Sequence, residues 1–97
     1  MVIREGQTSY GTILATIDGQ RIRQGHNNWG TVIARFDGKY VRKGDNVWGE
    51  ILFNFDGKNF RVGEAPWGDI VAHMDGNNIR AGQDPWGKIL AHIDYSL

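Results

Sequence analysis

Aromatic residues that could bind a ligand recur at a fixed spacing along this 97-residue chain. Tyr10, Trp29, Trp48, Trp67 and Trp86 lie 19 residues apart, and a glycine follows each of them. Flat aromatic faces bind sugar rings, cations or apolar side chains. The structural alternative is that each ring closes one end of a barrel or seals the contact between neighbouring repeats, because Trp is largely buried in most proteins. The sequence leaves both interpretations open.

Arginines and aspartates keep the same 19-residue step. The arginines are Arg4, Arg23, Arg42, Arg61 and Arg80, and the aspartates are Asp18, Asp37, Asp56, Asp75 and Asp94. Each arginine could pair with the aspartate of its own turn or of a neighbouring one, which would give a structural ladder repeated in every copy. The alternative is binding of an anion or a glycan beside the aromatic residues, with Arg23, Arg42, Arg61 and Arg80 as candidates.

Two histidines, His73 and His92, occupy equivalent positions in adjacent copies and could hold a metal with Asp75 or Asp94. The same position in the earlier copies holds Thr16, Arg35 and Asn54. Such variety is typical of a solvated surface position, and three ligands of suitable geometry are not evident. No nucleophile, base and acid occur together, and the polar groups are spread evenly over the copies. The sequence predicts a protein that is not an enzyme and carries neither metal nor cofactor.

The constant step makes the chain a tandem array that forms one domain, 1–97. The five copies run approximately over 2–20, 21–39, 40–58, 59–77 and 78–97. In WGTVIARFDGKYVRKG (29–44), Val32, Ala34 and Phe36 alternate with residues of the other face, and this period of two predicts a strand. Asp37-Gly38 then predicts a tight turn into a shorter strand that stops at Gly44. Each copy is therefore expected to form one antiparallel hairpin.

Apolar residues hold three alternating positions of the long strand in every copy, as Ile13, Ala15 and Ile17 do in the first. Burying each such side chain is worth roughly 1.5–3 kcal/mol, and ordering each residue costs about 1–2 kcal/mol of backbone entropy. We therefore expect one core shared by all copies. The reverse face carries a second apolar row, which consists of Leu14, Ile33, Leu52, Val71 and Leu90.

The two ends of the chain predict how the sheet is completed. The chain starts with a short strand at 2–5 and finishes with a long strand at 88–94, and pairing them would remove both sheet edges. We predict an all-β, up-and-down antiparallel meander of five hairpins, closed or nearly closed into a barrel with pseudo-fivefold symmetry and an aromatic rim opposite the Asp-Gly turns. The alternatives are an open hairpin array that pairs edge to edge, or one that packs its second apolar row against another copy as a dimer.

The overall composition narrows the range of partners. Eleven Lys and Arg balance eleven Asp and Glu, so the broad attraction that drives binding to nucleic acids or anionic membranes is absent. There are no cysteines, which excludes disulfides and thiolate metal sites. No stretch approaches the roughly 18 apolar residues of a membrane helix, and the first residues lack the apolar core of a secretory signal. We expect a cytoplasmic protein that binds neither nucleic acid nor membranes.

The segment GTVIARFDGKYVRKGDNVWG (30–49) resembles the hairpins of MORN repeats in its order of Gly, apolar strand, Asp-Gly, short strand and a second Gly near an aromatic residue. That resemblance covers the whole chain and implies a binding scaffold for protein or lipid contacts. The 19-residue period is somewhat shorter than that of MORN repeats. A short bacterial hairpin-repeat family without assigned chemistry fits the pattern more closely.

These observations favour a non-catalytic repeat scaffold or binding module. Its aromatic rim would offer several equivalent shallow sites to a glycan or a protein, and multivalency would supply the affinity. A first alternative is a self-assembling structural protein, a homo-oligomer that buries the second apolar row between subunits. A second alternative is a metal-dependent hydrolase built around His73 and His92.

Overall fold

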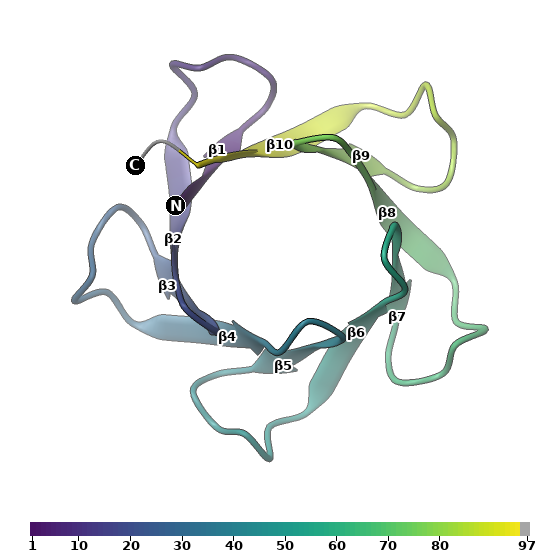
Figure 1. Ribbon diagram of the computed structural model, residues 1–97, viewed down its shortest axis with the longest axis horizontal. Coiled ribbons are helices and arrows are strands. Elements are labelled where there is room, and N and C mark those ends of the chain that lie inside the picture. The colour runs from purple at the N-terminus through teal and green to yellow at the C-terminus, as the bar shows by residue number, and fades with distance from the viewer. Residues whose placement is uncertain (96–97) are drawn as a thin grey trace.

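The computed structural model describes residues 1–95, which form an all-β closed barrel of ten antiparallel strands (Figure 1). Each 19-residue repeat contributes one short and one long strand, and residues 96 and 97 of the last repeat lie outside the described residues. The strands are β1 (Val2–Glu5), β2 (Ile13–Asp18), β3 (Arg21–Gln24), β4 (Val32–Phe36), β5 (Tyr40–Lys43), β6 (Ile51–Phe55), β7 (Asn59–Val62), β8 (Ile70–Asp75), β9 (Asn78–Ala81) and β10 (Ile89–Asp94).

The ring closes where β1 pairs with β10, as the sequence predicted. The hydrogen bonds across this seam match those between a long strand and the short strand that follows it in the chain. Gly6 N–H donates to Leu90 O at 2.9 Å, just as Gly25 N–H donates to Leu14 O at 3.0 Å. An ion pair of 3.0 Å between Arg4 and Asp94 crosses the seam and corresponds to the pair of Arg23 with Asp18. Because every strand has two partners, the described sheet has no free edge, and the open array is excluded.

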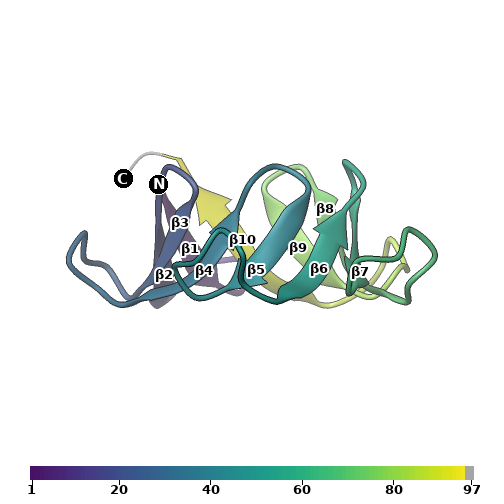
Figure 2. The same ribbon diagram turned by 90° about the horizontal axis from the view of Figure 1, so that it is seen from below.

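The molecule is a flat disc of 35 × 34 × 15 Å. Five loops between a short strand and the next long strand extend outward from the ring like petals (Figure 1). In side view they leave from the end of the barrel opposite the Asp-Gly turns (Figure 2). We call them petals 1 to 5, and they comprise residues 6–12, 25–31, 44–50, 63–69 and 82–88. Within residues 1–95 there is no helix long and apolar enough to cross a membrane.

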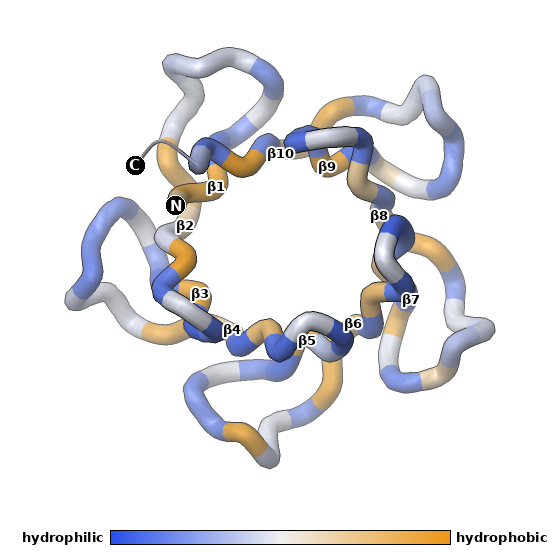
Figure 3. Tube along the Cα trace, in the orientation of Figure 1, coloured by the Kyte–Doolittle hydropathy of each residue, from blue (hydrophilic) through white to orange (hydrophobic). Residues whose placement is uncertain are grey.

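The inner face of the ring carries the predicted core positions. The Phe36 and Phe55 rings lie 5.9 Å apart edge to face although β5 separates their strands, and Phe60 stacks on Phe55 at 4.6 Å. Rings on strands that are not neighbours meet in this way on the concave side of a sheet, where side chains converge. Hydrophobic residues accordingly concentrate in the ring, and the petals and turns are mainly hydrophilic (Figure 3).

Burial of this core is incomplete. Ala15, Ala72 and Ala91 are buried, but the larger residues around them, such as Ile17 and Phe55, are only half-buried. The ring is short along its axis, so side chains near either end remain in reach of solvent. The alanines lie at mid-height in the long strands and are shielded from both ends.

The second apolar row does not form a regular sheet face. In every copy its residue is the one that the register skips, so that Leu14 has no partner between the pairs Ile3 with Ala15 and Arg4 with Ile13. Ile33, Leu52, Val71 and Leu90 are skipped in the same way. The row is therefore a ring of β-bulges, which bend the long strands where they leave the barrel for the petals. Four of the five residues are 39–46% exposed.

Candidate functional site: the petals and the notches beside them

Among residues 1–95, the five repeated aromatic side chains are the most exposed large hydrophobic ones. Tyr10, Trp29, Trp48, Trp67 and Trp86 are between 84% and 92% exposed. They lie in the petals and radiate away from the axis instead of converging on it. The interpretation as a barrel plug or a seal between repeats is therefore wrong, because the outward course of the petals takes the rings away from both the lumen and the neighbouring hairpins.

Two glycines fix the backbone of each petal. The first has a left-handed conformation, as at Gly25 with φ 71°, which side-chain-bearing residues rarely adopt. The second packs tightly against the preceding strand, and a Cβ added to Gly30 would lie 2.5 Å from the carbonyl oxygen of Gln24. The same distance separates an added Cβ at Gly49 from Lys43 O. Each petal is therefore held at both ends by contacts that do not involve its aromatic ring.

A local turn fixes the residue that bears the ring. In petal 2 the Trp29 N–H donates to the Asn27 side-chain oxygen at 2.7 Å, and the Gly30 N–H donates to Asn27 O at 3.2 Å. Asn46, Asp84 and Thr8 accept in the same way from the N–H groups of Trp48, Trp86 and Tyr10. Petal 4 has Ala65 at this position, and its Ala65 carbonyl instead accepts a bond from Asn54. The aromatic side chains are thus exposed on preorganised loops.

The repeated arginines hold the petals to the barrel. In every copy the guanidinium donates to the carbonyl oxygen of the glycine that ends its own petal, at 2.8–3.0 Å, as Arg23 does to Gly30. Arg23, Arg61 and Arg80 also pair with the aspartate of their own turn, and Arg4 pairs with Asp94 across the seam. The predicted ladder of Arg and Asp is thus present at these four. Whether the arginines also bind a ligand stays a prediction.

Arg42 departs from this pattern. Its guanidinium lies 5.6 Å from the centre of the Tyr40 ring, and the carboxylate of Asp37 accepts instead from the N–H groups of Tyr40 and Lys39. These bonds, first the one from Tyr40, hold the pKa of Asp37 below its usual range. Asp56 makes the equivalent bonds with Asn59 and Lys58, which lower its pKa in the same way. The second and third Asp-Gly turns, at Asp37 and Asp56, thus differ from the first and fourth in that the aspartate binds backbone N–H groups of its own turn.

The position of Thr16 and its equivalents, which the sequence predicted to be a solvated surface position, further anchors the petals. Thr16, Asn54 and His73 are 3–6% exposed, and each binds the glycine carbonyl that begins the next petal. His92 binds the Gly6 carbonyl at 2.7 Å across the seam. The solvated interpretation is wrong because the petal folds back over this part of the outer face. A threonine, an amide and an imidazole can all supply a donor, which accounts for the variety of residue types.

This bonding bears on the metal hypothesis. A carbonyl oxygen only accepts, so Nδ1 of His73 and Nδ1 of His92 carry the proton and face a glycine carbonyl. In the part of the chain that the structure describes, no group of three His, Asp or Glu residues is arranged to hold a metal ion.

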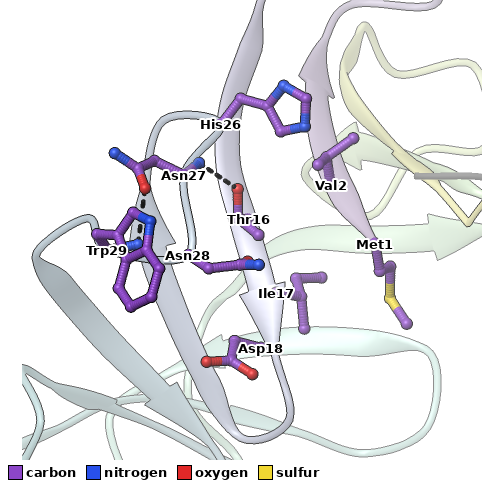
Figure 4. A pocket seen from close by; sticks show the side chains of 9 residues that line it. All are labelled: Met1, Val2, Thr16, Ile17, Asp18, His26, Asn27, Asn28 and Trp29. Carbon is purple, nitrogen blue, oxygen red and sulfur yellow. Dashed lines mark hydrogen bonds between the residues drawn. The ribbon is translucent and has the colours of Figure 1, made fainter.

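A cavity of about 440 Å³ lies beside petal 2, on the outer face of β2 (Figure 4). It is lined by Met1, Val2, Thr16, Ile17, Asp18, His26, Asn27, Asn28 and Trp29. We call it the Thr16 notch. Thr16 forms part of its back wall, where its hydroxyl bonds to Gly25 O at 2.6 Å and accepts from the Asn27 N–H at 3.2 Å. The lining residues come from two successive repeats, and they meet because petal 2 bends back over β2.

The same place in two other repeats holds smaller cavities. Beside petal 3 the Arg35 notch measures about 40 Å³ and is lined by Gln20, Arg35, Asp37, Arg42 and Val47. Beside petal 5 the His73 notch measures about 110 Å³ and is lined by Lys58, His73, Met74, Asp75 and Pro85. Thr16, Arg35 and His73 are equivalent residues, and the notch is largest where this position holds the short side chain of Thr16.

An ion cluster holds Arg35 in its notch. Arg35 and Arg21 both contact one oxygen of Asp45, at 3.0 and 2.9 Å, and Arg35 also donates to Gln20 at 3.2 Å. The hydrogen bonds from Arg21 and then Arg35 lower the pKa of Asp45, and the bond to Asp45 raises the pKa of Arg21. Arg35 stands directly opposite Arg42, so Asp45 also relieves a like-charge contact across the hairpin.

The predicted site residues are thus brought together only in part. Each aromatic residue belongs to a petal, and the arginines lie beneath the petals as anchors. Sequence reasoning missed Asn28, Asp18 and Val2 as lining residues of a cavity, and it left His26 without a partner. A signal was present, because this repeat alone combines a short polar side chain at position 16 with polar residues at positions 26 and 28.

Fold and site define the chain as a closed barrel of tandem β-hairpins that displays aromatic petals from a rigid ring. Residues 3–96 match the model of a family described as the 6-fold beta flower protein, and the chain belongs to that family. It is a tandem hairpin-repeat family, as the sequence suggested, and the comparison gives no support to the resemblance to MORN repeats. The description names a sixfold arrangement, whereas residues 1–95 form five hairpins. No curated protein and no solved structure matches the chain.

Proposed function

We propose that this protein is a multivalent binding scaffold whose petals recognise a glycan by stacking their aromatic rings on sugar rings. The observation that carries the proposal is the exposure of all five rings on loops that are fixed without them. An exposed indole gains little for the fold, since its apolar surface stays in water. Five such rings are therefore better explained by a partner that covers them.

The ring geometry supports a repetitive partner. The five petals lie around the rim of a molecule that is 35 Å across in all, so one molecule presents several similar contacts to an extended surface. Shallow stacking sites are weak one at a time, and linking them in a rigid frame raises the overall avidity without any new contact. A glycan chain or a glycan-covered surface offers the matching repetition.

Tryptophan fluorescence tests the proposal, with Trp48→Ala as the variant. Titration of neutral and acidic oligosaccharides should change the emission of the folded protein, and Trp48→Ala should keep its cooperative unfolding while binding more weakly. An unchanged emission with every glycan, together with a Trp48→Ala variant that no longer folds, would make the rings structural. If proteins change the emission and glycans do not, the partner is a protein.

Self-assembly is a second candidate, and the bulge residues favour it. Leu14, Ile33, Val71 and Leu90 leave part of their apolar surface in solvent at regular intervals around the ring. A second copy could cover this surface and bury it between subunits. Light scattering at high micromolar concentration decides the matter, because a strictly monomeric protein would exclude this role.

A further inference from the structure

The Thr16 notch differs from its counterparts in having unused polar groups around its space. Within residues 1–95 no hydrogen bond engages the ring of His26 or the side-chain amide of Asn28, although both line the cavity (Figure 4). One oxygen of Asp18 bonds to Arg23 at 3.3 Å, and Arg21 stands opposite Asp18 across the hairpin. In the Arg35 notch the residue equivalent to His26 is Asp45, which two arginines occupy, and the residue equivalent to Asn28 is Val47.

These groups match the chemistry of a sugar ring. The cavity combines the exposed Trp29 ring and the buried Val2 side chain with donors and acceptors on His26, Asn28 and Asp18. A ligand site of this kind uses apolar walls for contact and a few placed polar groups for orientation, and its volume falls in the usual range of roughly 300–1,000 Å³. A hexopyranose presents an apolar face of C–H groups and a rim of hydroxyls, so both kinds of wall would be used.

The charge of the lining selects among sugars. Asp18 is the charged side chain among the residues that line the notch, and its half-exposed carboxylate is already paired with Arg23 behind it. A uronate or another acidic sugar would place its carboxylate near Asp18, and like charges in a partly desolvated site repel. An uncharged sugar avoids this cost, and its hydroxyls can donate to the exposed part of the Asp18 carboxylate.

We propose that the Thr16 notch is the principal carbohydrate site of the ring and binds one neutral hexopyranose unit of the glycan, which stacks on Trp29 and hydrogen-bonds to Asn28, His26 and Asp18. This proposal rests on the proposed function and sharpens it. The remaining petals add avidity through ring stacking, whereas the Thr16 notch recognises the sugar.

The indole N–H signals of the four tryptophans in the NMR spectrum provide the test, once each is assigned by a Trp→Phe variant. The probes are the neutral methyl hexopyranosides of gluco, manno and galacto configuration, with glucuronate as the acidic counterpart of glucose. At least one neutral probe should shift the Trp29 signal at concentrations that leave Trp48, Trp67 and Trp86 unchanged. Glucuronate should bind at least about tenfold more weakly.

Two substitutions check the assignment within one fold. Asn28→Val introduces the residue that the Arg35 notch has at this position and should weaken the Trp29 response by about tenfold or more. Its matched control is Val47→Asn, which places the amide in the closed notch and should leave the Trp29 response unchanged. Thr16→Arg fills the cavity as Arg35 fills its own and should abolish the response in a chain that still unfolds cooperatively.

The outcomes separate this inference from the proposed function. If neutral sugars shift all four indole signals at similar concentrations, the petals bind glycans and the principal site at Thr16 is refuted. If glucuronate binds as tightly as the neutral sugars, the charge argument is wrong. If no sugar shifts any signal, both the inference and the proposed function fail.

Discussion

The Thr16 notch and the Arg35 notch occupy the same place in successive repeats, yet one has a volume of about 440 Å³ and the other about 40 Å³. Their backbones are built alike, because the same pairs of glycines and the same arginine bonds hold both petals. The difference lies in side chains that the fold does not prescribe. Thr16 anchors its petal by a bond to Gly25 O, whereas Arg35 bonds to Asp45 and Gln20 and fills the space of its notch. A repeat frame can thus keep its geometry while individual sites open or close.

The largest expected effect tests whether the two frames are equivalent. Gly30→Ala and Gly49→Ala should each cost about 2–4 kcal/mol of unfolding free energy, because in both an added Cβ would lie 2.5 Å from a backbone oxygen. Urea unfolding followed by circular dichroism measures the loss. If only one of the two variants loses unfolding free energy, the two petals are held differently.

Giving the Arg35 notch the side chains of the Thr16 notch should create a second binding site. The double variant Arg35→Thr with Val47→Asn should open the second notch and produce a shift of the Trp48 indole signal with the neutral hexopyranosides. We expect an affinity within about tenfold of the Trp29 site, since Arg21 still replaces Val2 there. If the Trp48 signal does not shift in the folded double variant, the side chains that line the notch do not determine binding.

The hydrogen bond that Thr16 makes to the petal can be removed with almost no change in side-chain size. Thr16→Val deletes the bond to Gly25 O and leaves a half-buried carbonyl without that partner, which should cost about 1–2 kcal/mol. Differential scanning calorimetry should show a lower melting temperature. Leu90→Ala serves as a comparison at a partly exposed bulge residue, and a Thr16→Val protein as stable as the parent would refute the anchoring role.

The smallest expected effect is a loss of stability in acid that arises from Asp45 in the Arg35 notch. The folded pKa of Asp45 is lowered, so its ion pairs favour the fold at neutral pH and are lost as the pH falls below the usual Asp range of about 4. The parent should therefore unfold at slightly higher urea than Asp45→Asn at pH 7, and the gap between the two midpoints should narrow as the pH falls below about 4. A gap that persists or widens in acid would contradict this assignment.

Much of the ring could be predicted from the sequence, because its determinants are local and repeated. Alternation, Asp-Gly turns and the unmatched end strands define hairpins that close through β1 and β10. The bulges could not be foreseen in the same way. Leu14 alternates like a residue of the outer face, and only the register shows that it is an inserted residue.

The site escaped prediction because it depends on the course of the petals. A repeated Trp is usually buried, but outward loops leave Trp29 in solvent, and the same loops bury Thr16 beneath them. Val2 and Asn28 lie 26 positions apart in different repeats and line one cavity only in the folded ring. The spacing of these residues along the chain therefore does not predict that they line the same cavity.

The central claim is that the five aromatic rings serve binding and not folding. Its most direct measurement compares the parent with a variant in which Tyr10, Trp29, Trp48, Trp67 and Trp86 are all replaced by Ala, by urea unfolding and by binding to an array of immobilised neutral glycans. We predict an unfolding free energy within about 1–2 kcal/mol of the parent and complete loss of glycan binding. A variant that fails to fold, or one that folds and still binds the same glycans, would contradict the account.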